Sequence, residues 1–246
     1  MNATALVMEQ KKETVKQSQR IQTSVLNAAE KKALVWMGER MPRWVSSDMM
    51  TAIGTIGAVV IALGYALSGK NINFLWLASL GFVLNWFGDS LDGTIARVRN
   101  QQRPKYGFFI DHTVDVVNET LMFIGMGLSP LMDFDIAMMI LAAYLMLSVY
   151  VYISAHLKGE FKLTYAKMGP TELRIIAIIM NTLFVLIKPL REFSAHIRLF
   201  GKDLSLGVLD IAGIIIVIAL LGAYFVSIFH DAKIYAKEEP LPKRDQ

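Results

Sequence analysis

The chain has 246 residues, of which 54% are hydrophobic, and a formal net charge of +4. Its mean hydropathy of +0.43 is too high for an ordinary soluble domain and indicates residence in a membrane. The absence of cysteine excludes disulfides, thiolate metal sites and a cysteine nucleophile. The basic residues lie beside apolar runs and not in a stripe interleaved with aromatics, so the charge favours contact with anionic lipid over nucleic acid.

The N-terminal part of the chain is polar and charged, and it divides into two segments. Residues 1–20 have the composition of a mobile polar segment. In residues 21–48, apolar side chains recur among lysines and glutamates as in an amphipathic helix, with Trp36 and Trp44 near its end. Such a helix is expected to lie in the membrane interface, with its lysines toward lipid headgroups. The alternative is a helix that packs against a partner subunit.

The boundary between this helix and the first apolar run is marked by helix-ending and helix-capping residues. Pro42 is expected to break or kink the amphipathic helix. The stretch Ser46-Ser47-Asp48 is expected to cap the first membrane span.

Six apolar runs follow, each close to the roughly 20 residues that cross the hydrocarbon core of a bilayer. They lie at about 49–68, 73–96, 107–130, 133–157, 170–190 and 205–229. The predicted fold is therefore all-α: an integral membrane six-helix bundle over residues 49–230, preceded by the amphipathic helix and followed by a tail at 231–246.

An even number of spans places both termini on one side of the membrane. Most lysines and arginines lie in the N-terminal segment, the second-to-third connection, the fourth-to-fifth connection and the tail, which share that side. Positive-inside counting therefore predicts that both termini are cytoplasmic. The basic residues in 189–204 go against this trend, so that stretch is either a short interfacial helix or a failure of the predicted topology.

Four carboxylates lie at the edges of the second and third runs: Asp89, Asp92, Asp111 and Asp115. Each ionised group at membrane depth costs on the order of 2.5–3.5 kcal/mol, so four of one sign need a compensating partner. The first two are three residues apart and the last two are four apart, which places each pair on one face of a helix. Oxygen ligands in this pattern favour a hard divalent cation shared with a phosphate-bearing substrate.

Small side chains share the carboxylate face of the second span. Gly93 follows Asp92 directly, and Ala96 lies about one helical turn after Gly93. One interpretation is close contact between membrane helices, which needs no ligand. The other is a phosphate-bearing ligand that approaches the backbone there, because the guanidinium of Arg97 and bound cations would complement a diphosphate.

These residues carry a resemblance to a known family. The pattern D-x-x-D-G-x-x-A-R, followed by G-x-x-x-D-x-x-x-D, is filled by Asp89, Asp92, Gly93, Ala96, Arg97, Gly107, Asp111 and Asp115. It resembles the signature of the CDP-alcohol phosphotransferases. Nine residues separate Arg97 from Gly107, where eight is the commonest family spacing. The extra residue falls in a polar loop, where insertions are tolerated.

The resemblance implies a reaction and a metal centre. An alcohol attacks one phosphorus of a CDP-linked alcohol, CMP leaves, and a phosphodiester lipid forms. The family pattern implies two Mg²⁺ or Mn²⁺ ions, with Asp89, Asp92 and Asp111 as the main ligands. Asp115 would contribute at the second ion and accept the alcohol proton as general base.

The same resemblance implies where the substrates bind. The CDP moiety would contact Asp92, Gly93, Ala96, Arg97 and Gly107. The implied partners are the CDP-linked alcohol, the second alcohol and membrane lipid, without nucleic acid. A homodimer is compatible with the family, and the active site would face the cytoplasm.

A second group of polar residues surrounds the fourth-to-fifth connection on the same side. Candidate acceptor-binding residues are His156, Lys167, Glu172 and Arg174. Arg174 lies one turn into an apolar helix that opens at Gly169-Pro170, so its charge should face the interior or snorkel to the membrane surface. It is expected to bind a substrate phosphate or to pair with Glu172 or an aspartate.

Two branches of the family share features with this stretch. G-P-T-E-x-x-R resembles phosphatidylinositol phosphate synthases, which implies transfer from CDP-diacylglycerol to a polar alcohol such as inositol phosphate or glycerol phosphate. The run from His156 to Glu172 is also similar to choline and ethanolamine phosphotransferases, in which a soluble CDP-alcohol donates to diacylglycerol or a related lipid alcohol. The first arrangement is favoured here. A cation transporter is the non-enzyme alternative, although it does not require this order of Gly, Ala and Arg.

Overall fold

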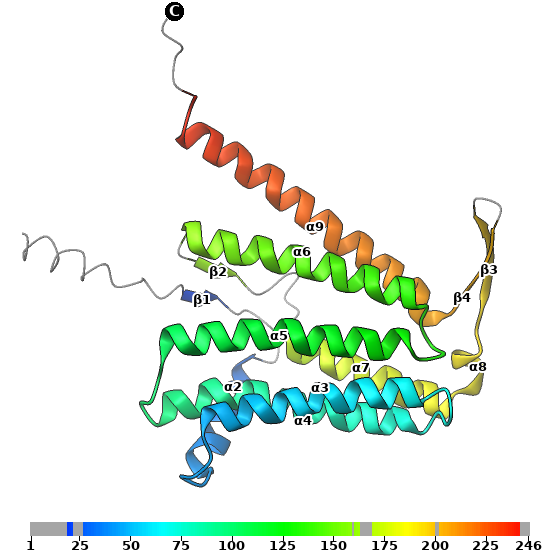
Figure 1. Ribbon diagram of the computed structural model, residues 1–246, viewed down its shortest axis with the longest axis horizontal. Coiled ribbons are helices and arrows are strands. Elements are labelled where there is room, and N and C mark those ends of the chain that lie inside the picture. The colour runs from blue at the N-terminus through cyan, green and yellow to red at the C-terminus, as the bar shows by residue number, and fades with distance from the viewer. Residues whose placement is uncertain (1–18, 22–26, 159, 163–168, 200–201, 242–246) are drawn as a thin grey trace, which may run out of the picture.

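The computed structural model describes residues 19–21, 27–158, 160–162, 169–199 and 202–241. Its helices are α2 (Asn27–Arg40), α3 (Ser47–Leu67), α4 (Phe74–Val98), α5 (Pro104–Gly127), α6 (Phe134–Lys158), α7 (Pro170–Leu186), α8 (Lys188–Arg191) and α9 (Val208–Glu238). Its strands are β1 (Gln19–Ile21), β2 (Glu160–Lys162), β3 (Ala195–Leu199) and β4 (Lys202–Leu206). Long helices dominate the structure (Figure 1), which confirms the predicted all-α membrane bundle.

Four helices among the described residues are long and apolar enough to cross a membrane, namely α3, α4, α6 and α9. Helix α5 carries the aspartates, and α7 has only 17 residues. Both run alongside the other long helices (Figure 1). The count of six spans therefore stays a prediction, which requires α5 and α7 to cross as well.

Glycines bring α3 and α4 into close contact. A Cβ atom on Gly88 of α4 would lie 2.2 Å from the backbone nitrogen of Gly54, and a Cβ atom on Gly57 would lie 2.4 Å from the backbone nitrogen of Asn85. Small residues at such crossings let membrane helices pack backbone to backbone. The contact places Asp89, which follows Gly88, beside the first turns of α3.

Replacing Gly88 by leucine should separate α3 from α4, because the atoms that its side chain would meet belong to a backbone that cannot rotate away. Overpacking of this kind costs about 1–3 kcal/mol or more. The measurement is the melting temperature in detergent, with Gly222→Leu as the matched control, since a Cβ there meets nothing within 4 Å in the described chain. Equal melting temperatures for the two variants would show that the contact is not tight.

Helix α2 ends before Pro42 and rests on α4. Its Leu34 packs with Val45 of the following linker and with Leu91 and Ile95 of α4. The linker leads into α3, whose N-cap is Ser46 and whose first turn contains Asp48. The side chain of Ser46 accepts a hydrogen bond from the backbone N–H of Met49 at 3.1 Å, so the predicted start of the first span is confirmed.

Most of the segment that contains the unexpected basic residues forms a β-hairpin, and helix α8 covers only its first residues. Of the two alternatives for 189–204, the interfacial helix is therefore wrong for most of the stretch. Strand β3 pairs antiparallel with β4, and β1 pairs in parallel with β2. The reason lies in the alternation of apolar and polar residues in Ala-His-Ile-Arg-Leu, a period of two that suits a strand. The last helix, α9, begins after this hairpin and continues to Glu238, beyond the predicted end of its apolar run.

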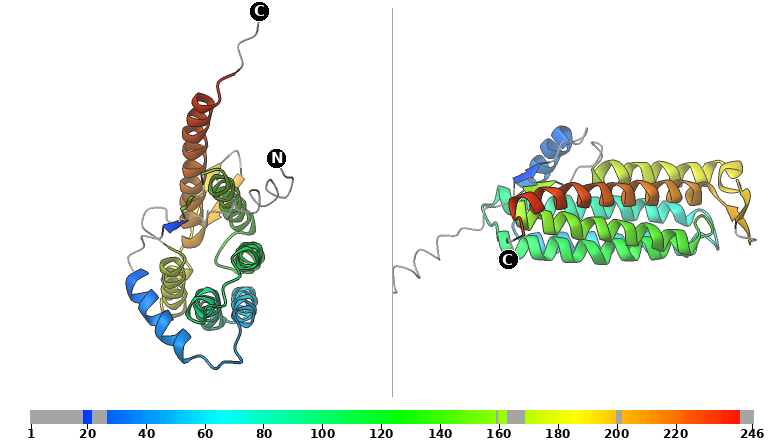
Figure 2. Two further views of the ribbon diagram at one scale, coloured as in Figure 1. Left: turned by 90° about the vertical axis from the view of Figure 1, so that its left-hand side faces the viewer. Right: turned by 90° about the horizontal axis from the view of Figure 1, so that it is seen from above.

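The two ends of the bundle differ. The hairpin and α8 lie at one end, while α2 and the loop between α4 and α5 lie at the other (Figure 1). Helix α9 packs on α6, and its C-terminal part extends away from the remaining helices (Figure 2). Helix α4 therefore ends, and helix α5 begins, at the α2 end of the bundle.

Candidate active site

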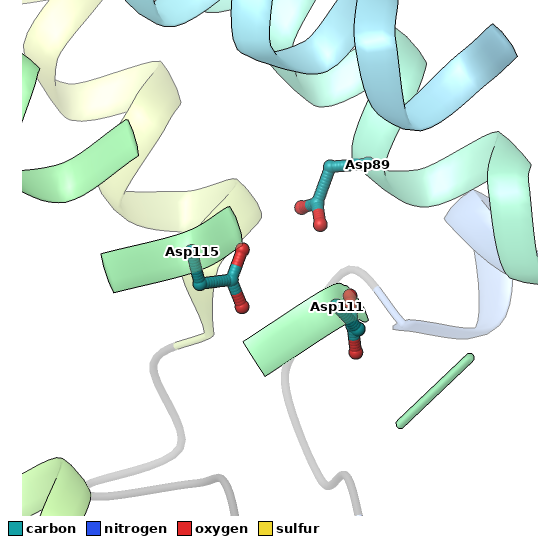
Figure 3. A group of neighbouring side chains, drawn as sticks. All are labelled: Asp89, Asp111 and Asp115. Carbon is teal, nitrogen blue, oxygen red and sulfur yellow. The ribbon is translucent and has the colours of Figure 1, made fainter. Parts of the chain in front are cut away.

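Three carboxylates from two helices face one another in the structure. Asp89 extends from α4, and Asp111 and Asp115 extend from α5 (Figure 3). One oxygen of each lies within 4.8 Å of those of the others, and all three side chains are partly buried. The four-residue spacing on α5 brings its two aspartates to one face, as the sequence predicts. This group could hold a divalent cation through oxygen ligands.

Asp92 stands beside this group and is held by the start of α3. The hydroxyl of Thr51 donates a hydrogen bond to its Oδ2 at 2.8 Å, and the backbone N–H of Gly93 donates to its Oδ1. The hydroxyl of Ser47 donates to its backbone oxygen at 2.7 Å. Asp92 is thus oriented by α3, whereas the three other carboxylates form the tight group.

Two cavities adjoin the carboxylates. The smaller has a volume of about 10 Å³ and is lined by Thr51, Gly54, Asp89, Asp92, Asp111, Val114, Asp115 and Asn118. The larger, of about 830 Å³, lies among α2, α4, α5 and α7 and also reaches Asp89, Asp92 and Asp111. Its volume is in the range of ligand sites. Asp115 and Asn118 line only the smaller of these two cavities, at the inner side of the carboxylate group.

The residues predicted to contact the CDP moiety border the larger cavity, including Gly93, Ala96, Arg97 and Gly107. A Cβ atom on Gly93 would first meet the guanidinium of Arg97, at 3.1 Å, and one on Gly107 would meet nothing within 4 Å in the described chain. Unlike Gly88, neither glycine presses against the backbone of a neighbouring helix. This geometry favours the ligand interpretation of Gly93 over helix packing.

Arg174 of α7 forms the predicted ion pair with an aspartate. Its Nη2 donates to Oδ2 of Asp89 at 2.6 Å, and the two side chains are 17% and 27% exposed. Arg174 also lines the larger cavity. The pair therefore links the carboxylate group to the predicted acceptor-binding region.

The other predicted acceptor residues are not gathered around Arg174 in the same way. Glu172 accepts a hydrogen bond from the backbone N–H of Gly169 at 3.0 Å and caps α7. His156 is exposed in the last turn of α6 and is absent from the described lining of both cavities. Lys167 lies outside the described residues.

Glu30 of α2 joins three helices, a role that sequence reasoning missed. Its Oε1 accepts hydrogen bonds from Nε1 of Trp86 on α4 and from the hydroxyl of Thr171 on α7, each at 2.7 Å. Thr171 is 141 residues away in the chain, so no local sequence pattern predicts the contact. The contact holds α2 against the larger cavity, which Glu30 itself lines.

Replacing Glu30 by alanine should loosen α2 from the bundle, since hydrogen bonds to a charged acceptor contribute about 1.5–3 kcal/mol. Hydrogen exchange of the backbone amides in α2 should become faster, while that of α6 stays unchanged. Glu39→Ala, at an exposed position of the same helix, is the control. Equal exchange in the two variants would contradict a role of Glu30 in holding α2.

A second connection crosses the rim of the larger cavity. Arg103 donates to Oδ1 of Asp48 at 2.5 Å, and its guanidinium lies over the ring of Tyr106. The hydrogen bond that Arg103 donates to the Asp48 carboxylate raises the pKa of Arg103 above its usual value. Because both charged side chains are about half exposed, the pair contributes little stability. Its importance lies in placing a permanent cation beside the cavity.

Comparison with known proteins gives the family. A family model described as CDP-alcohol phosphatidyltransferase matches residues 44–225. The chain is 39% identical to the phosphatidylinositol phosphate synthase of Cutibacterium acnes over 84 residues, which are 34% of this chain and 38% of that protein. It is 27% identical to the archaetidylinositol phosphate synthase of Pyrococcus horikoshii over 144 residues, 58% of this chain and 72% of that protein. Since the family model spans most of the chain, this protein belongs to the CDP-alcohol phosphatidyltransferase family, as its aspartate motif predicts.

Proposed function

We propose that this protein synthesises a phospholipid by transferring the phosphatidyl group of CDP-diacylglycerol to a polar alcohol, with inositol phosphate as the first candidate and glycerol phosphate as the second. The observation that carries the proposal is the motif of the family at the boundary of the two cavities. A carboxylate group, arginines and two glycines meet there, and neither glycine presses on the backbone of a neighbouring helix. A diphosphate requires this combination of room and charge.

The choice of acceptor rests on two supports. Both relatives described above are named as inositol phosphate lipid synthases. In addition, Arg174 reaches the larger cavity beside Asp89 and can bind the phosphate of a phosphorylated alcohol. The alternative choline and ethanolamine branch draws on His156, whose exposed position gives it no comparable support.

The proposed reaction assigns distinct work to the side chains. The hydroxyl oxygen of the acceptor forms a bond to the phosphorus next to diacylglycerol, and the bond from that phosphorus to the bridging oxygen breaks. CMP leaves with the bridging oxygen, and Asp115 accepts the hydroxyl proton as the new bond forms. Gly93 and Ala96 leave room for the cytidine, while Arg97 binds phosphate and Arg174 orients the acceptor.

The residues present fit one or two Mg²⁺ or Mn²⁺ ions. Three carboxylates offer oxygens within 4.8 Å of one another, and Asp92 lines the same small cavity. Asp89, Asp111 and Asp115 would hold a cation, with Asp92 and Asp115 completing a second position. The chemistry supplied by such cations is neutralisation of the diphosphate and of the charge on the attacking and leaving oxygens.

The proposal places the larger cavity at the cytoplasmic side of a multi-pass membrane protein. Arg97 in the last turn of α4 and Arg103 in the connection to α5 border this cavity, and positive-inside counting assigns such basic residues to the cytoplasmic side. Both termini would then be cytoplasmic, and α2 would lie in the membrane interface. A homodimer remains part of the proposal.

The test is release of CMP by the purified protein in lipid. CDP-diacylglycerol is supplied with inositol phosphate, glycerol phosphate or free inositol, and in separate reactions CDP-choline or CDP-ethanolamine is supplied with diacylglycerol. We expect Mg²⁺-dependent CMP release with CDP-diacylglycerol and a phosphorylated alcohol, and no release after chelation.

The other possible outcomes would favour one of the two alternative functions. CMP release with only the soluble CDP-alcohols would favour the choline and ethanolamine branch. If the folded protein bound divalent cations and released no CMP with any pair, the transporter alternative would be examined by cation flux into vesicles.

A further inference from the structure

Asn118 of α5 is a buried amide beside the carboxylate group. The residue is 6% exposed, and its Oδ1 has no hydrogen-bond partner among the described residues. Asn118 lines the smaller cavity together with Asp89, Asp111 and Asp115. A buried oxygen without a donor is unfavourable, so its presence at this cavity points to a ligand that the oxygen meets there.

The position of Asn118 follows from the pattern on its helix. Asp111, Asp115 and Asn118 stand at positions i, i+4 and i+7 of α5, which lie on one face. Asn118 therefore lies one turn beyond Asp115 on the helix face that carries the candidate ligands. The spacing of the aspartate pairs alone does not predict a role for this residue.

Two other buried asparagines, Asn181 and Asn85, form hydrogen bonds that support helix packing and serve as a comparison for Asn118. Asn181 accepts from the hydroxyl of Tyr65 at 2.9 Å and donates to the hydroxyl of Ser79 at 3.3 Å. Asn85 has an unpartnered oxygen among the described residues, but its Nδ2 donates to the backbone oxygen of Gly54 at 3.0 Å, between α3 and α4. Neither residue belongs to the described lining of the smaller cavity. Among the described residues, Asn118 alone combines burial, an unpartnered oxygen and a place beside the carboxylates.

We infer that Asn118 is a further oxygen ligand at the cation centre, through its Oδ1 or through a water that the cation carries. A neutral amide oxygen among ionised carboxylates cannot be satisfied by them, because ionised carboxylates only accept hydrogen bonds. It can be satisfied by a hard divalent cation, which takes amide and carboxylate oxygens alike. The inference deepens the proposed function and rests on its metal centre. Its expected role is to hold the cation at the inner end of the carboxylate group, beside Asp115.

The experiment measures Mn²⁺ binding by electron paramagnetic resonance in purified protein without substrate. Asn118→Leu should weaken Mn²⁺ binding by about 10- to 100-fold, the range for lost partners around a metal centre. Asn118→Asp, which keeps an oxygen at the position, should bind Mn²⁺ at least as tightly as the unmodified protein. Thr120→Val changes a neighbouring side chain that donates to the backbone oxygen of Val116, and its affinity should stay unchanged.

A second measurement separates a ligand from a packing residue. In the presence of a chelator, Asn118→Leu should melt at a higher temperature than the unmodified protein, because leucine removes the unpartnered buried oxygen. Weaker Mn²⁺ binding together with higher stability without metal is not expected of a residue that only supports the fold.

Different failures have different meanings. If the unmodified protein binds Mn²⁺ and Asn118→Leu binds it equally well, the role of Asn118 is overturned and the proposed function stands. If both Asn118 variants lose stability and Mn²⁺ binding together, Asn118 supports the fold and is not a ligand. If the unmodified folded protein binds no Mn²⁺, the metal centre of the proposed function is overturned, and the role of Asn118 with it.

Discussion

Asp115→Asn is expected to lower the turnover of CMP release by about 10²- to 10⁴-fold, the usual loss when a general base is removed. Asparagine has nearly the same shape as aspartate but cannot accept the alcohol proton as the new bond forms. Asp115 lies on the inner side of the carboxylate group, where it lines the smaller cavity. The protein should stay folded, because the substitution changes charge and leaves the volume almost unchanged.

Because Asp115 is also a candidate metal ligand, turnover must be measured at saturating Mg²⁺ and Mn²⁺ binding must be followed in parallel. Asp135→Asn is the control, since Asp135 is exposed in the first turn of α6, at the hairpin end of the bundle. A variant that binds Mn²⁺ normally and turns over slowly would have lost the base. Near-normal turnover of Asp115→Asn would refute the assignment.

The long helices could be predicted from the sequence because their signals are local. Each apolar run exceeds the length of a soluble core helix, and Pro42 and Ser46 mark the boundary before α3 by backbone chemistry alone. The hairpin could not be predicted in this way. Its strands are only five residues long, so their period of two is a weak local signal, and the sequence leaves a short interfacial helix and a failure of the topology as alternatives.

In the candidate site, too, local features could be predicted from the sequence and contacts between distant helices could not. The aspartate pairs could be predicted because spacing within one helix determines which side chains share a face. The contacts of Glu30 with Trp86 and Thr171 could not, because they join helices that are far apart in the chain and depend on how those helices pack. The partner of Arg174 could be predicted only as a choice, since a charge at that depth needs a partner and the sequence leaves a substrate phosphate, Glu172 and an aspartate open.

The last prediction concerns the Asp89–Arg174 pair, whose two members should have opposite effects on cation binding. Asp89→Asn removes a carboxylate from the tight group, so Mn²⁺ binding should weaken by more than the roughly 10- to 100-fold that loss of an outer partner costs. Arg174→Met removes the guanidinium that forms an ion pair with Oδ2 of Asp89. Because this positive charge no longer competes with the cation, Mn²⁺ binding should become tighter. The same variant should lose affinity for a phosphorylated acceptor.

The stability of the metal-free protein should behave differently from cation binding. Arg174→Met should lower the melting temperature in chelator, because it leaves the partly buried Asp89 among other carboxylates without its cation. The double variant should recover part of that loss, with a coupling of about 0.5–3 kcal/mol for residues in contact, while Mn²⁺ binding stays weak. Additive losses in the double variant would mean that the pair contributes no coupling. Removal of a nearby positive charge should by itself strengthen cation binding. Weaker Mn²⁺ binding in Arg174→Met would therefore mean that the arginine supports the cation centre and does not compete with the cation.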